Sequence, residues 1–158
     1  GHDGHGEEEM NELELSNVEQ AAMVREKIDR LEAEMRQFPA VDIPVKHYFA
    51  TGLYVREITI PANVLAVGKI HKTQHINMLL KGDVTMVTDQ GTLRVQAPYT
   101  WVVEPGKKAA AYAHEETVWT TIHATEETDL EKLEAELIAT DYEAFDLLGA
   151  KESQPCLG

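Results

Sequence analysis

The protein has 158 residues, a formal net charge of −14 at pH 7 and hydrophobic residues at 43% of its positions. This length suits one domain with appendages and is sufficient for a hydrophobic core. An acidic surface is repelled by the phosphates of nucleic acids and of anionic membranes, so we expect neither as a partner. No apolar run approaches the roughly 20 residues that a membrane-spanning helix needs.

Cysteine usage and the first residues bear on the cellular compartment. Cys156 is the single cysteine, so no disulfide can form within the chain, which fits a reducing environment. The first ten residues lack the basic and then apolar segments of a signal peptide. Both features predict a cytoplasmic protein.

The N-terminal region predicts a flexible tail followed by an amphipathic helix. Residues 1–11 show no periodicity, whereas a capping box from Ser16 to Glu19 opens a regular pattern within residues 12–38. Apolar residues then recur at spacings of three and four, which is a heptad seam. They are Ala21, Val24, Ile28, Leu31, Met35 and Phe38. The seam needs a partner, which can be the same helix of a second copy or the protein's own sheet.

Residues 45–125 have a different character, with short β-favouring runs separated by turn signals. The predicted strands are Lys46–Phe49, Tyr54–Ile60, Val64–Ile70, Ile76–Lys81, Asp83–Thr88, Gly91–Val95, Thr100–Val103, Ala109–Tyr112 and Thr117–Ala124. Strands at this spacing, with little helix between them, indicate a sandwich or a jelly-roll barrel.

Helical patterns return at residues 128–149. A second capping box, from Thr128 to Glu131, begins a helix whose apolar stripe runs from Leu130 to Ile138. A further short helix is expected from Thr140 to Gly149, and residues 150–158 are expected to form a loose tail.

The segment Asn63–Gly82 carries the most specific pattern in the chain. Its spacing resembles the first motif of the cupin superfamily, in which a glycine, His-x-His, a glutamate and a closing glycine follow one another. Asn63 stands at the first glycine and Lys69 at the first histidine. His71 matches the second histidine, His75 takes the glutamate position, and Gly82 matches the closing glycine.

Residues 104–106 resemble the turn of the second cupin motif, and the histidine of that motif falls on Ala109. The resemblance covers about half of the chain. It implies a mainly β protein with a single cupin-type jelly-roll barrel over residues 45–125, flanked by the N-terminal helix and the C-terminal helices.

His71 and His75 are the candidate metal ligands. On a straight strand their side chains would lie about 13 Å apart, so they can share a metal only if the backbone bends at residues 72–74. His123, near the end of the last strand, is either an interior histidine with its own partners or the third ligand. A triad of His71, His75 and His123 would suit one divalent transition metal such as zinc, iron or manganese.

Longer stretches, VDIPVKHYFATGLYVREITIPA, GKIHKTQHINMLLKG and TVWTTIHATEETDLEKLEAEL, are similar to small cupin-domain proteins of tailed bacteriophages. That resemblance implies a homo-oligomeric structural or binding protein, non-catalytic or weakly metal-binding. It would associate through the N-terminal helix or the sheet faces, in the host cytoplasm or in a virion with other phage proteins.

The alternative function is enzymatic. A metal-dependent cupin oxygenase or isomerase would use the three histidines. A metal-free sugar isomerase or epimerase would instead pair a histidine with Tyr99 or Tyr112 for acid–base work. Sugar-nucleotide substrates would call for basic residues, for which Lys69, Lys81 and Arg94 are available.

Overall fold

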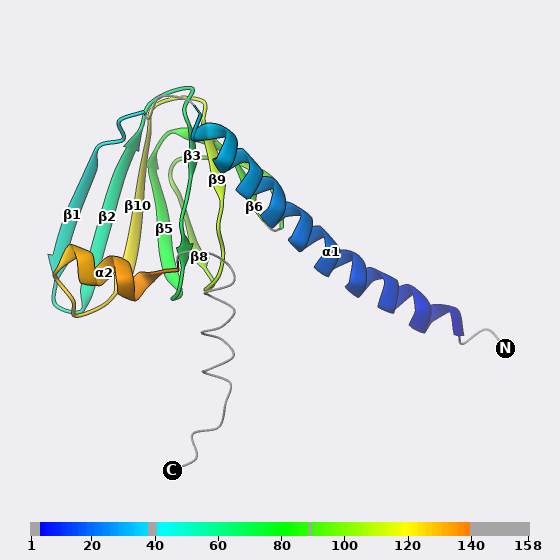
Figure 1. Cartoon of the computed structure of the whole chain (residues 1–158). Helices are drawn as coiled ribbons and strands as arrows, with labels where there is room; N and C mark the ends of the chain where they lie inside the picture. Colours follow the sequence, from blue (N-terminus) through cyan, green and yellow to red (C-terminus); the bar gives the residue numbers. More distant parts are fainter. Residues whose placement is uncertain (1–3, 38–40, 89, 140–158) are drawn as a thin grey trace, which may run out of the picture.

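A computed structural model of the protein describes residues 4–37, 41–88 and 90–139. Within them two antiparallel sheets face each other, and a long helix leads into the barrel they form (Figure 1). The elements are α1 (Gly4–Met35), β1 (Val45–Ala50), β2 (Leu53–Ile60), β3 (Leu65–Val67), β4 (Ile70–His71), β5 (His75–Lys81), β6 (Asp83–Thr88), β7 (Gly91–Gln96), β8 (Tyr99–Val103), β9 (Ala110–Ala113), β10 (Thr117–Ala124), α2 (Leu130–Leu137) and β11 (Ile138–Ala139).

The first sheet has five strands in the order β1-β2-β10-β5-β8, and the second has four in the order β3-β9-β6-β7. Alternate residues of each strand point inward, so apolar side chains of the two sheets meet in one core. Its buried members are Ile60, Leu79, Val84, Met86, Val95, Ala111 and Ala113. The predicted mainly β jelly-roll architecture is therefore confirmed.

The strand predictions agree with the structure within one or two residues, with one exception. The expected continuous strand Val64–Ile70 is wrong, because it is divided into β3 and β4. The break follows the last β3–β9 pair: the Gly68 N–H still donates to the carbonyl of Ala109 at 2.9 Å, in the same register, but residues 68–69 belong to no strand. This break turns β4 toward β11 instead of continuing along β9.

Helix α1 is longer at its start than predicted. It begins at Gly4, so residues 4–11 are helical rather than a tail, and Ser16 lies within the helix instead of capping it. The reason is composition: residues 7–15 are rich in Glu, Leu and Met, which have high helix propensity. The helix ends at Met35 rather than reaching residue 38, which lies outside the described residues.

The heptad seam lies partly against this protein's own barrel. Ile28 is 2% exposed, α1 contacts β6, and the Lys108 ammonium pairs with Asp29 and Glu32 of the helix. In Figure 1 the N-terminal half of α1 projects away from the barrel. The C-terminal half is therefore a docked element, and self-association through the projecting half stays a prediction.

The C-terminal region differs from a purely helical segment. Asp129, not Thr128, caps α2 by accepting a hydrogen bond from the Lys132 N–H, and Leu133 and Leu137 are buried against Tyr54. Directly after α2 the chain forms β11, which pairs with β4 so that Ile138 lies opposite His71. The second predicted helix and the tail lie outside the described residues. None of the helices in the part of the chain described here is long and apolar enough to cross a membrane.

Candidate metal centre

Three histidines from three strands converge at one end of the barrel. His71 ends β4, His75 begins β5, and His123 lies near the end of β10. Strands β5 and β10 are neighbours, with Ile76 opposite Ile122. Because side chains alternate along a strand, the adjacent residues His75 and His123 both face the inside of the barrel. The chain bends at residues 72–73, which brings the His71 and His75 rings to 4.2 Å and confirms the predicted bend.

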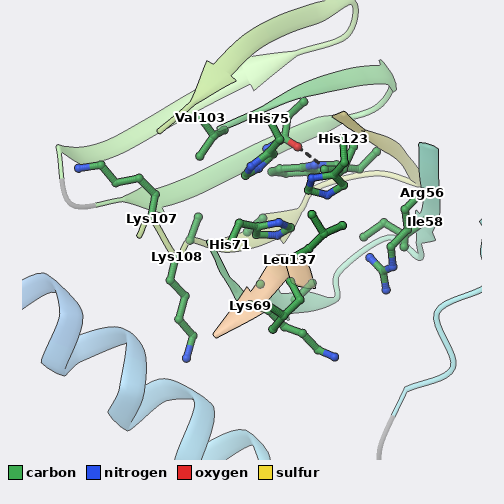
Figure 2. Close-up of a pocket in the computed structure, with 18 of the residues that line it drawn as sticks. Arg56, Ile58, Lys69, His71, His75, Val103, Lys107, Lys108, His123 and Leu137 are labelled. Atoms are coloured by element: carbon green, nitrogen blue, oxygen red, sulfur yellow. Dashed lines mark hydrogen bonds between the residues drawn. The ribbon is translucent and has the colours of Figure 1, made fainter. Parts of the chain in front are cut away.

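The rings form a compact triangle (Figure 2). Their centroids are 4.2 Å apart for His71 and His75, 5.1 Å for His71 and His123, and 5.0 Å for His75 and His123. Each ring offers one nitrogen such that these nitrogens lie within 4.8 Å of one another. The structure therefore brings together all three histidines that the sequence singles out.

The environment keeps these imidazoles neutral. Burial lowers the pKa of His71 to about 3 and that of His123 to about 4, and neighbouring charged groups add to both shifts. Burial also lowers the pKa of His75, which a hydrogen bond to the Thr73 carbonyl partly opposes. Because a metal binds only the unprotonated ring, three neutral rings are a ready donor set near pH 7.

The hydrogen bonds leave ring nitrogens of the triad without partners. His75 Nδ1 lies 3.1 Å from the Thr73 carbonyl oxygen, and since a carbonyl only accepts, Nδ1 carries the proton and Nε2 the lone pair. Nδ1 of His71 and Nδ1 of His123 are buried with no hydrogen-bond partner among the described residues. Buried polar atoms normally have partners, so this donor set fits a transition-metal ion well.

Two of the positions where the sequence departs from the cupin pattern, Lys69 and Ala109, lie beside the triad. The Lys69 ammonium pairs with Glu134 of α2 at 2.8 Å, and its charge also contributes to lowering the His71 pKa. Ala109 lines the cavity with a methyl group. A metal on the triad would thus have no protein ligand from position 109, which leaves room for water or a substrate.

A cavity of about 670 Å³ opens from the histidines into the barrel. Its inner wall is apolar and includes Trp101 and Trp119, whose rings meet edge to face at 5.1 Å. Buried polar groups lie next to the triad, where the Thr121 hydroxyl donates to the Asn77 side-chain oxygen at 3.0 Å. Both the volume and the mixture of apolar walls with a few polar groups are typical of small-molecule sites.

Sequence reasoning missed two residues of this cavity, Tyr54 and Arg56, which lie beside His47. The Tyr54 hydroxyl and His47 Nδ1 are 2.6 Å apart, Tyr54 stacks on His123 with centroids 6.1 Å apart, and burial raises the Tyr54 pKa. Strand alternation could have found Tyr54 and Arg56, since both share the inward face of β2 with Ile58.

Several residues that the sequence suggested for acid–base catalysis or substrate binding lie outside the cavity. Tyr99 and Tyr112 do not line the cavity, and Tyr112 instead donates to Asn63. Lys81 and Arg94 are also outside the cavity, paired with Glu116 and Asp83. The predicted pairing of His71 or His75 with Tyr99 or Tyr112 is therefore wrong. Tyr99 faces inward but lies opposite Leu79, away from the cavity, and Tyr112 alternates with the core residues Ala111 and Ala113 on β9.

Comparisons with known proteins bear on the fold. No protein-family model and no curated protein matches the sequence. Among solved structures, ectoine synthase from P. lautus is similar with a TM-score of 0.51 and 11% identity, over 65% of this chain and 78% of that one. An RmlC-like cupin family protein with a double-stranded β-helix fold from Methanocaldococcus jannaschii has a TM-score of 0.46 and 14% identity, over 55% and 84%. At these identities the similarity concerns the fold and not the activity.

Proposed function

Since this chain has the fold of the cupin superfamily, we propose that it is a metal-dependent enzyme acting on a small molecule in the barrel cavity. His71, His75 and His123 would hold one divalent transition-metal ion, of which zinc, iron and manganese suit imidazole donors. A bound ion of this kind supplies a Lewis acid that polarises an oxygen-bearing group of a substrate.

One observation carries this proposal: nitrogens of two buried histidines and the half-buried His71 lie within 4.8 Å of one another, while two buried ring nitrogens of the triad lack partners. A purely structural histidine cluster would satisfy its buried nitrogens within the protein, because an unpartnered buried polar atom costs roughly 1–3 kcal/mol. The cavity beside the rings supports a role beyond metal storage, since a structural metal site would be closed by a fourth protein ligand.

The proposed enzyme would be an oxygenase or an isomerase. The cavity residues other than the triad would bind and orient the substrate. Tyr54 and His47 form a hydrogen-bonded pair at the same cavity and are the candidates for moving a proton to or from a bound molecule.

Metal content tests the proposal. Protein purified without a metal-affinity step is expected to contain about one equivalent of metal by elemental analysis. Since three imidazoles are needed, His71→Ala, His75→Ala and His123→Ala should each abolish that metal. His114→Ala is the matched control, because His114 bonds Thr85 and lies outside the triad. Wild-type protein that neither contains nor takes up zinc, iron or manganese would contradict the proposal.

A second candidate function, a homo-oligomeric structural or binding protein, is favoured by a different surface. The outer face of the five-stranded sheet carries one apolar residue from each strand in a continuous cross-strand row. The row consists of Tyr48, Val55, Ile122, Ile76 and Val102, and Val102 is 58% exposed. Apolar surface of this kind favours contact with a second copy. A phage virion role stays a prediction from resemblance.

A further inference from the structure

Arg56 faces the cavity close to the histidine triad. It lies on β2 opposite Thr121 of β10, and Tyr54, two residues before it, lies opposite His123. Residues opposite one another on paired strands share a face of the sheet, so Arg56 and His123 are on the same inward face. Figure 2 shows the Arg56 side chain on one side of the triad, with Lys107 and Lys108 on the other.

Arg56 differs from its neighbours in having no polar partner. Lys69 pairs with Glu134, and Lys108 pairs with Asp29 and Glu32. Among the described residues, the Arg56 guanidinium makes neither a hydrogen bond nor an ion pair, although it lines the cavity. Its positive charge is felt by His71 and His123, where it contributes to lowering their pKa values.

Arg56 is exposed at the cavity, and the carboxylate whose pKa it lowers, that of Glu134, is already paired with Lys69. An arginine without an ion pair of its own stands out because the protein is so acidic. The formal net charge is −14, with 28 carboxylate residues against 14 lysines and arginines, so carboxylate partners are plentiful. A guanidinium presents planar, paired N–H donors that match a carboxylate, and such bidentate bonds are stronger than neutral ones. The unused donors at this cavity therefore point to an anionic ligand from outside the chain.

The other residues that line the cavity indicate the chemistry of the part of the ligand beyond its anionic group. Ile58, Ile60, Met86, Trp101 and Trp119 contribute an apolar wall. A volume of about 670 Å³ is far more than a carboxylate group alone would fill. A phosphorylated sugar would place several hydroxyls against this wall without partners, which is unfavourable. In a ligand with a carboxylate on an apolar body, the carboxylate can bind Arg56 while the body packs against the apolar wall.

We propose that the ligand of this cavity is a small carboxylic acid with an apolar body, whose carboxylate is held by Arg56 beside the histidine triad. The inference rests on the proposed metal-dependent function. The contact between Arg56 and the carboxylate, however, does not involve the metal ion. Arg56 is thereby a substrate-binding residue that orients the ligand toward the triad.

Paired probes test this assignment by isothermal titration calorimetry of the metal-loaded protein with hexanoate and with hexanamide, which differ in charge but hardly in shape. Wild-type protein is expected to prefer hexanoate. Arg56→Gln should weaken hexanoate binding by about tenfold or more, and Arg56→Lys by less, because it keeps the charge but loses the paired donors. Lys46→Gln removes the same charge from the outer face of the same sheet and should change binding less than about twofold.

The two levels of the proposal fail in different ways. Wild-type protein that neither contains nor takes up metal overturns the metal-dependent function, whatever the probes do. Equal hexanoate affinity in wild type and Arg56→Gln, or binding in neither, overturns the carboxylate assignment while metal content stays at one equivalent. A wild-type preference for hexanamide would overturn it as well.

Discussion

Replacing Gly82 with alanine is expected to lower the free energy of unfolding by roughly 3–5 kcal/mol, because backbone strain and overpacking add at this position. Gly82 has a φ of +117°, a backbone conformation that residues other than glycine rarely adopt. A Cβ there would also clash with the Thr117 hydroxyl oxygen and lie 2.8 Å from the Thr117 Cα. Urea unfolding followed by fluorescence measures the loss.

Gly91→Ala separates the two causes. Gly91 has a nearly identical φ of +115°, yet a Cβ there meets nothing within 4 Å. Its substitution should therefore cost about 1–2 kcal/mol from backbone conformation alone. Equal losses for the two variants would show that the contact with Thr117 is not what requires glycine at position 82.

The metal-free protein should lose about 4 kcal/mol of stability between pH 7.5 and pH 5 through His71 and His123, since each pKa unit is worth about 1.36 kcal/mol. Their folded-state pKa values, about 3 and about 4, lie below the unfolded value of 6.5. The unfolded chain therefore binds more protons below pH 6.5. The stability is fully present above pH 6.5 and is lost as the pH falls toward the folded-state values.

The double variant His71→Gln/His123→Gln provides the comparison for this pH dependence. Glutamine is polar and similar in size but does not titrate, and the carboxylates contribute the same change to both proteins. Urea unfolding in EDTA at the two pH values should show a smaller loss in the variant. An identical pH dependence in both proteins would mean that the two histidines do not stay neutral in the folded state.

Much of the barrel can be predicted from the sequence because its strands alternate regularly and are separated by strong turn signals. Strands Asp83–Thr88 and Thr117–Ala124 have the predicted bounds. The motif positions also carry over to the backbone: Asn63, at the first glycine of the pattern, has a φ of +64°, which asparagine tolerates. Gly82 occupies the position where glycine is sterically required.

The rest depends on contacts between distant segments. The two-residue strand β11 is set by pairing with β4, and so short a strand has no periodicity to recognise. His123 joins the triad because β10 lies between β2 and β5, which local patterns do not encode. Arg56 carries no motif of its own, and the pairing of β2 with β10 places it at the cavity.

X-ray absorption spectroscopy of the metal-loaded protein tests the central claim most directly. If His71, His75 and His123 hold the ion, the spectrum should show three imidazole nitrogens at about 2.0–2.2 Å, and His123→Ala, which should not retain the metal, should give no such spectrum. A spectrum dominated by carboxylate oxygens, or one unchanged in His123→Ala, would contradict a metal centre built on the triad.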